Sequence, residues 1–143
     1  MHRRIAIFML LALTLLLFTG CRAYSLTDEL PPLIDPQTQL PKVTAISVTR
    51  ASDGAVVTLT ETADLNTMML QLDGIRGSKT KEELTTFTKT YPILYTITFF
   101  VGDSTEPALY VCGTEEFYRS DYSWLAVRGG VDLLYLESLF AQP

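Results

Sequence analysis

The sequence predicts an α+β domain in which an antiparallel sheet of about five strands carries two packed helices. Residues 43–51 and 55–61 alternate between apolar and polar side chains around an Asp53-Gly54 turn, as in a hairpin. Residues 65–75 instead have helical spacing, and residues 93–101 alternate again. Separate segments of strand and helix period are typical of the α+β class.

A signal helix is expected before this domain. Two arginines, an uncharged run over residues 5–18 and the small pair Thr19-Gly20 precede Cys21. This order is the layout of a secretory signal. A transmembrane helix needs about 20 apolar residues, and a plain secretory peptide usually ends in an Ala-x-Ala-like site. The segment is slightly short for a transmembrane helix and lacks the cleavage site of a plain secretory peptide. These two interpretations are kept as the alternatives to the one that follows.

Thr19-Gly20-Cys21 resembles the lipobox of bacterial lipoproteins, where small residues precede an invariant cysteine, although Phe18 replaces the usual Leu, Val or Ile. The resemblance implies that signal peptidase II removes residues 1–20 and that Cys21 becomes a lipidated N-terminus carrying palmitate-type chains. Two or more acyl chains give stable anchoring. The resemblance to a lipobox therefore implies a lipid anchor at the extracytoplasmic face of the cell membrane. The alternative for Cys21 is a disulfide with Cys112, the only other cysteine.

The composition of the remaining 123 residues restricts the chemistry. They hold nine basic and 16 acidic side chains, a formal charge of −7, which argues against a nucleic-acid partner. The only histidine, His2, lies in the signal. Histidine-based catalysis and zinc sites that need histidine are thereby excluded. No cofactor and no metal is expected.

Residues 21–42 contain four prolines and are expected to form an extended linker, leaving residues 43–143 as a single domain. For the helix over 65–75, Thr62 is the expected N-cap and Gly74 the expected end. Polar residues 76–90 are expected to form a long loop with a short edge strand at 84–88. The remaining expected elements are a central strand at 93–101, strands at 108–112, 117–118 and 124–128, and a closing helix at 131–140.

A second resemblance involves the helix at 65–75, the basic stretch 76–81, the strands at 95–101 and 110–113, and the end at 124–140. Together these resemble small lipoprotein domains of unknown function from Gram-positive bacteria. The resemblance carries no catalytic residues over to this chain.

Three cations in the polar stretch, Arg76, Lys79 and Lys81, are candidates for contact with an anion such as a phosphate-rich wall polymer. Ser78 and Lys81 also spell Ser-x-x-Lys, the nucleophile motif of penicillin-binding enzymes. That motif opens a helix in a much larger domain, whereas here it follows a glycine in a polar stretch. A solvated basic loop is the simpler interpretation.

Aromatic residues gather around the Ser120-Asp121 turn, and aromatic faces beside polar groups suit sugar or peptide ligands. The candidate ligand or partner contacts are Tyr118, Arg119, Tyr122 and Trp124. If Leu125 and Val127 face the core, alternation exposes Trp124. The alternative is that Trp124 packs on the sheet beside a helix.

Cys112 is expected to be a buried free thiol. The function expected from these observations is that of a lipid-anchored, non-catalytic binding or structural module of the cell envelope. Its partners would be the membrane, through Cys21, and an envelope protein or wall polymer. The alternatives are a small carboxylate-based hydrolase and an accessory or inhibitor subunit of a membrane transporter or sensor.

Overall fold

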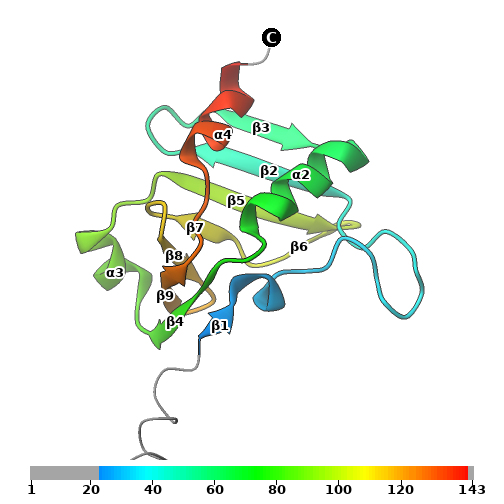
Figure 1. The fold of residues 1–143 in the computed structure, drawn as a ribbon. Helices are drawn as coiled ribbons and strands as arrows, with labels where there is room; N and C mark the ends of the chain where they lie inside the picture. The colour runs from blue at the N-terminus through cyan, green and yellow to red at the C-terminus, as the bar shows by residue number, and fades with distance from the viewer. Residues whose placement is uncertain (1–22, 142–143) are drawn as a thin grey trace, which may run out of the picture.

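The computed structural model describes residues 23–141, so the expected signal and Cys21 lie outside the described part of the chain. Within that part, one antiparallel sheet of nine strands organises the fold in the order β1-β4-β9-β8-β7-β5-β2-β3, with β6 beside β5 (Figure 1). The strands are β1 (Tyr24–Ser25), β2 (Ala45–Arg50), β3 (Val56–Leu59), β4 (Arg76–Lys81), β5 (Tyr95–Val101), β6 (Ser104–Thr105), β7 (Leu109–Val111), β8 (Glu116–Arg119) and β9 (Tyr122–Arg128). The helical segments are η1 (Leu26–Glu29), α2 (Thr62–Leu72), α3 (Leu84–Thr90), α4 (Leu133–Ser138) and η2 (Leu139–Ala141). The α+β class is confirmed, with more strands than the expected five.

The expected hairpin and central strand are both present. β2 pairs with β3 across a turn in which Gly54 has a φ of +71°, a conformation that glycine adopts without strain. β5 lies between β2 and β7, and both pairings are antiparallel. Tyr95, Ile97 and Phe99 of β5 are all buried on one face of the sheet.

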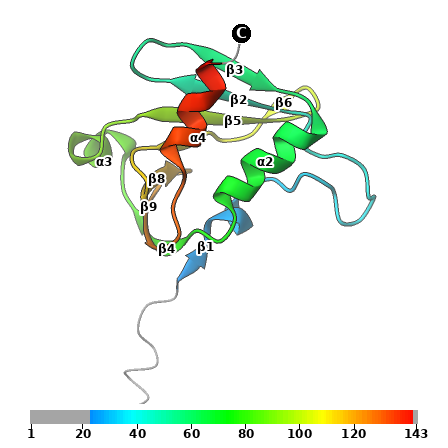
Figure 2. The same ribbon diagram turned by 45° about the horizontal axis from the view of Figure 1, so that its top comes forward.

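Helices α2 and α4 lie on that same face (Figure 2). Between them and the sheet is the main core, which includes Ile46, Val48, Leu65, Met68, Leu72, Ile97, Phe99, Phe117 and Leu136. Glu61 precedes α2 and makes no side-chain cap, so Thr62 is the first helical residue and not the N-cap. Gly74 follows the end of α2 with a φ of +77°. Asp132 caps α4 by accepting hydrogen bonds from the amides of Leu134 and Tyr135.

The expected loop over 76–90 is wrong, because these residues form a strand and a helix. β4 is polar, yet it is paired on one side by β9 and on the other by β1. A Cβ on Gly77 would lie 2.3 Å from the carbonyl oxygen of Leu125, so this bulged position needs glycine. Tertiary pairing thus overrides a weak local preference for strand.

Helix α3 forms where a short edge strand was expected. Leu84, Phe87 and Tyr91 have i, i+3, i+7 spacing and pack with Cys112 and Tyr118 in a second, smaller core. This core lies on the opposite face of the sheet from α2 and α4. Pro92 disfavours helical geometry at Tyr91, which explains why α3 ends there.

The segment after Cys21 is not wholly a linker. Tyr24 and Ser25 pair with Gly77 and Arg76 of β4, so the folded domain includes residues from Tyr24 onward and does not begin at residue 43. Leu26 is fully buried and Leu30 nearly so. Burial of two leucines against the domain is the physical reason that this stretch folds despite the prolines that follow it.

Candidate functional site

Residues from both predicted site sets meet where β4 and β9 lie side by side. Lys79 pairs in register with Trp124, and Lys81 with Tyr122. Cross-strand partners point to the same face of a sheet. β1 adds Tyr24 from the outer side of β4, and η1 adds Glu29. Sequence reasoning missed these last two because it assigned them to a linker.

The Lys79 ammonium is surrounded by three aromatic rings and one carboxylate. It lies 4.8 Å from the ring centre of Tyr24, 4.9 Å from that of Tyr122 and 5.8 Å from that of Trp124. Its Nζ donates to Oε1 of Glu29 at 3.0 Å. Cations within about 6 Å of an aromatic face are attracted by the ring quadrupole. We call these five residues the Lys79 cage.

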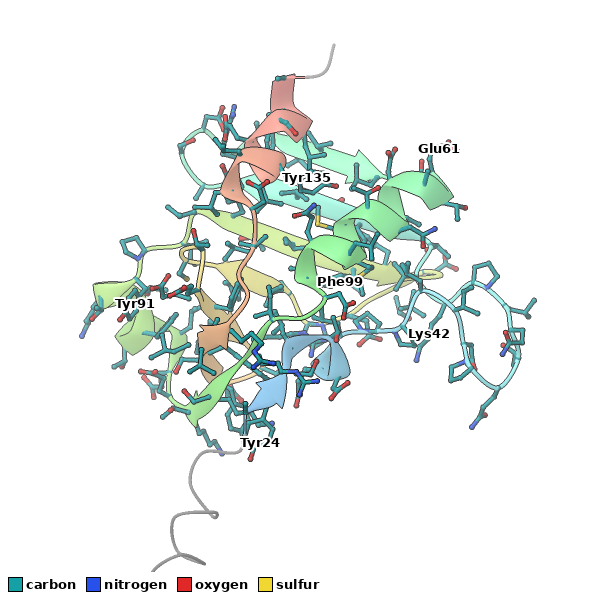
Figure 3. The ribbon with its side chains drawn as sticks, viewed as in Figure 1. Tyr24, Lys42, Glu61, Tyr91, Phe99 and Tyr135 are labelled. Carbon is teal, nitrogen blue, oxygen red and sulfur yellow. The ribbon has the colours of Figure 1, made fainter. Side chains whose placement is uncertain are left out.

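The carboxylate and the ring packing give this cage its electrostatics. The pKa of Lys79 is raised, first because its ammonium donates a hydrogen bond to Glu29. Tyr24 and Trp124 meet edge to face at 6.3 Å between ring centres. Tyr24 lies at one end of the molecule in Figure 3, far from Glu61 at the start of α2. The cage therefore fastens the first strand to one end of the domain.

Arg119, at the end of β8, holds the same N-terminal segment from the strand next to β9. Its Nη1 donates to the main-chain carbonyl of Glu29, and its Nε donates to that of Pro107 at 3.2 Å. The side chain is buried, and burial lowers its pKa. Two cations on different strands, Lys79 and Arg119, thus contact the side chain and the main chain of one residue, Glu29.

Of the two alternatives for the aromatic residues around the Ser120-Asp121 turn, the structure has the one in which Trp124 packs on the sheet. Trp124 is only 2% exposed and packs in the main core, whereas Leu125 and Val127 are 42% and 73% exposed. The condition under which Trp124 would be exposed, that Leu125 and Val127 face the core, is therefore not met. Tyr118 and Arg119 are also buried, and of the four predicted contacts only Tyr122 is half-exposed.

The three predicted anion contacts do not converge. Lys79 is held by Glu29, while Arg76 and Lys81 lie exposed at opposite ends of β4. Arg76 lines a depression together with the acidic side chains of Asp28 and Glu29, which would repel an anion. Side chains three positions apart in a strand point to opposite faces, so the Ser78 and Lys81 of the Ser-x-x-Lys pattern cannot act on one substrate.

A second ionic cluster fastens the C-terminal helix, and no sequence pattern indicated it. Arg50 forms two hydrogen bonds to the carboxylate of Asp53 and one to Glu137 on α4. Its guanidinium carbon lies 4.5 Å from the ring centre of Phe140. The hydroxyl of Tyr95 donates to the other oxygen of Glu137 at 2.7 Å. These contacts tie the β2–β3 hairpin and β5 to the last helical turns.

Cys112 is a buried free thiol, as predicted. Burial, with a smaller contribution from the negative charge of Glu116, raises its pKa to about 11. A thiol with so high a pKa is a poor nucleophile at neutral pH, because the thiolate is the reactive form.

Comparisons with known proteins add nothing to this geometry: no protein-family model, curated protein or solved structure matches the chain. In the described part of the chain, no group of three or more histidine, cysteine, aspartate or glutamate side chains is placed to hold a metal ion. Over residues 23–141, no helix has the length and apolar character needed to cross a membrane.

Proposed function

We propose that the protein is a lipid-anchored, non-catalytic module of the bacterial cell envelope, whose domain is held directly against the membrane. One observation carries this proposal: Tyr24, only three residues after Cys21, is already part of the sheet. A chain spans at most about 3.3–3.6 Å per residue. A lipid on Cys21 would therefore lie within roughly 11 Å of Tyr24.

The contacts of the N-terminal segment support a mechanical role for it. A pull on Cys21 would reach the domain first at Tyr24. There it meets the β1–β4 pairing, the Lys79 cage and, through Glu29, the buried Arg119. These contacts would pass the load into three strands of the central sheet, β4, β9 and β8, so that the domain keeps one orientation at the membrane.

The proposed absence of catalysis rests on the sequence. The chain after residue 20 has no histidine. Its formal charge of −7 gives no attraction to anionic lipid, so the acyl chains would supply the whole of the membrane affinity.

Metabolic labelling tests the anchor. Cells expressing the protein are grown with labelled palmitate, and the Cys21→Ser variant serves as the comparison. Label should enter the unaltered protein and be lost in the variant, which should then leave the membrane fraction. Equal labelling of the two proteins would refute lipidation at Cys21.

Distance to the bilayer tests the tight tether separately. Because Tyr24 pairs with Gly77 and Ser25 with Arg76, the start of β1 is directed toward the Lys81 end of β4. We therefore expect the lipid on Cys21 to lie at that end. A fluorophore on Lys81→Cys should be quenched strongly by lipids with spin-labelled headgroups, and one on Glu61→Cys weakly. Cys112 stays unlabelled because it is buried with a high pKa.

A lengthened tether is the matched control. Twenty Gly/Ser residues inserted between Arg22 and Ala23 would have a root-mean-square span of about 25 Å. This insertion should remove most of the difference between the two labelled positions. Equal quenching at both positions in the original chain would contradict the proposal.

A further inference from the structure

A pocket opens on the sheet face that carries α3, over β7 and β8, whereas the Lys79 cage lies on the opposite face over β1, β4 and β9. Its volume is about 470 Å³, within the range of small-molecule sites. β7 and β8 supply the side chains of Tyr110 and Tyr118, the start of α3 supplies Glu83, and the β8–β9 turn supplies Asp121. This is where the aromatic turn singled out from the sequence reaches a cavity.

Two tyrosine rings supply its aromatic surface. Tyr110 and Tyr118 are cross-strand partners whose ring centres lie 6.3 Å apart with planes tilted by 52°. Phe87 supports Tyr118 from α3 at 6.0 Å, and the Tyr118 hydroxyl donates to the carbonyl of Glu82 at 2.7 Å. Tyr118 is thereby fixed in place, while Tyr110 is half-exposed and accessible to a ligand.

The rim of this pocket is negatively charged, and the residues of the described part of the chain that line it include no lysine or arginine. The ion pairs among residues 23–141 use Asp53, Glu137 and Glu29, so Glu83 and Asp121 take part in none of them. The pKa of the Tyr118 hydroxyl is raised, first by burial and then by the nearby negative charges of Asp121, Glu82 and Glu83. The raised pKa is consistent with a negatively charged rim.

We propose that this pocket binds a small organic ammonium ion, with the half-exposed Tyr110 facing the cation, the buried Tyr118 lining the pocket, and Glu83 and Asp121 balancing the charge. The Lys79 cage shows the same chemistry within this chain, since aromatic rings and one carboxylate there surround an ammonium group. Lys79 fills the cage, whereas no lysine or arginine is among the residues of 23–141 that line the pocket on the opposite face. Aromatic surfaces are the usual means of recognising quaternary ammonium groups.

The ammonium could be a free metabolite or the headgroup of a zwitterionic lipid, and the two share the chemistry that the pocket recognises. The inference does not depend on the lipid anchor, because the pocket lies wholly within residues 83–121. A protein that proved not to be lipidated would still be expected to bind the free cation.

Nuclear magnetic resonance titration of the full-length protein in non-ionic detergent tests the proposal. Choline chloride is the probe, and 3,3-dimethylbutan-1-ol, its neutral isostere, is compared at equal ionic strength. Choline should shift the amides of residues 83–85 and 118–121 in a saturable way, while the neutral alcohol should not. Equal shifts with both compounds, or none with choline at tens of millimolar, would overturn the proposal.

Variants assign the contacts. Tyr110→Leu should weaken choline binding about two- to fivefold through loss of the ring. Glu83→Gln and Asp121→Asn should each weaken it by a similar factor. Glu83 makes no side-chain cap on α3, and asparagine tolerates the left-handed backbone at Asp121, where φ is +66°, so both folds should persist. Glu61→Gln is the control, because Glu61 lies directly before α2 and does not line the pocket; this variant should bind choline normally.

Lipid nanodiscs then separate the two sources. If phosphatidylcholine nanodiscs shift the same amides and compete with free choline, the ligand is a headgroup. If only free choline does so, the ligand is a small soluble cation. Unchanged choline affinity in all three pocket variants would show that binding occurs elsewhere and would refute the site.

Discussion

Replacing Lys79 by methionine removes the cation from the Lys79 cage while keeping an unbranched apolar side chain of similar length. The partly exposed ion pair with Glu29, with side chains 23% and 40% exposed, should contribute at most about 1 kcal/mol. The ring contacts at 4.8–5.8 Å would contribute roughly 0.5–1 kcal/mol each at exposed sites. Because all of them involve the one ammonium group of Lys79, these values do not simply add. We therefore expect the free energy of unfolding to fall by about 1–2 kcal/mol.

The loss should not be larger, because Glu29 remains half-exposed and hydrated. Removing one member of a fully buried ion pair would instead cost about 3–5 kcal/mol. Urea denaturation measures the global change, and hydrogen exchange locates it. The Leu26 amide, which donates to the carbonyl of Ile75 at 3.0 Å, should exchange faster in the variant.

Lys81→Met is the matched control, because Lys81 lies on the same strand and face but is exposed and forms no ion pair among residues 23–141. Its stability should change by less than about 0.5 kcal/mol. If the two variants lose equal stability, or if the Leu26 amide keeps its protection in Lys79→Met, the cage does not hold the N-terminal segment.

Three further outcomes are expected. Leu26→Ala should lower the free energy of unfolding by about 2–5 kcal/mol, since Leu26 is fully buried, whereas Leu70→Ala at an exposed position should change it by less than about 0.5 kcal/mol; similar values in urea denaturation would contradict the burial. Cys112, with a pKa of about 11, should react with iodoacetamide at pH 8 roughly a hundredfold more slowly in the native than in the denatured protein, and comparable rates would be inconsistent with its burial. Asp53, whose pKa is held near 2 first by hydrogen bonding to Arg50, should add stability that is present above its ordinary value of 3.8 and lost as the pH falls toward 2; Asp53→Asn should remove this part of the pH dependence, and identical profiles would argue against the pairing.

Sequence reasoning found the elements whose apolar residues repeat clearly. The β2–β3 hairpin, β5, α2 and the closing helix were all expected near their observed positions, because local alternation or helical spacing suffices to specify them. α3 was missed although Leu84, Phe87 and Tyr91 have helical spacing, since a threonine-rich stretch favours strand. β4 was missed because its residues are polar and show no strand pattern of their own. This segment becomes a strand through its pairing with β1 and β9.

The candidate site was predicted only in part, for the same reason. Lys79, Tyr122 and Trp124 were singled out in two unrelated sets, and nothing in their spacing indicated that one cage would join them. Tyr24 and Glu29, more than 45 positions before Lys79, complete the cage through a strand pairing that has no local signal. The sequence left open whether Leu125 or Trp124 faces the core, because both are apolar and alternation alone does not say which parity faces inward.

By itself, the sequence determined the α+β class, the position of Cys21 after an apolar run, and a remaining chain that is acidic and has no histidine. These follow from composition and local period, which need no knowledge of distant contacts. The tertiary structure alone decided that Tyr24 belongs to the sheet, that Trp124 is buried and that Lys79 lies among three rings. Each of these depends on which strands become neighbours, and long-range pairing is set by the packing of the whole sheet.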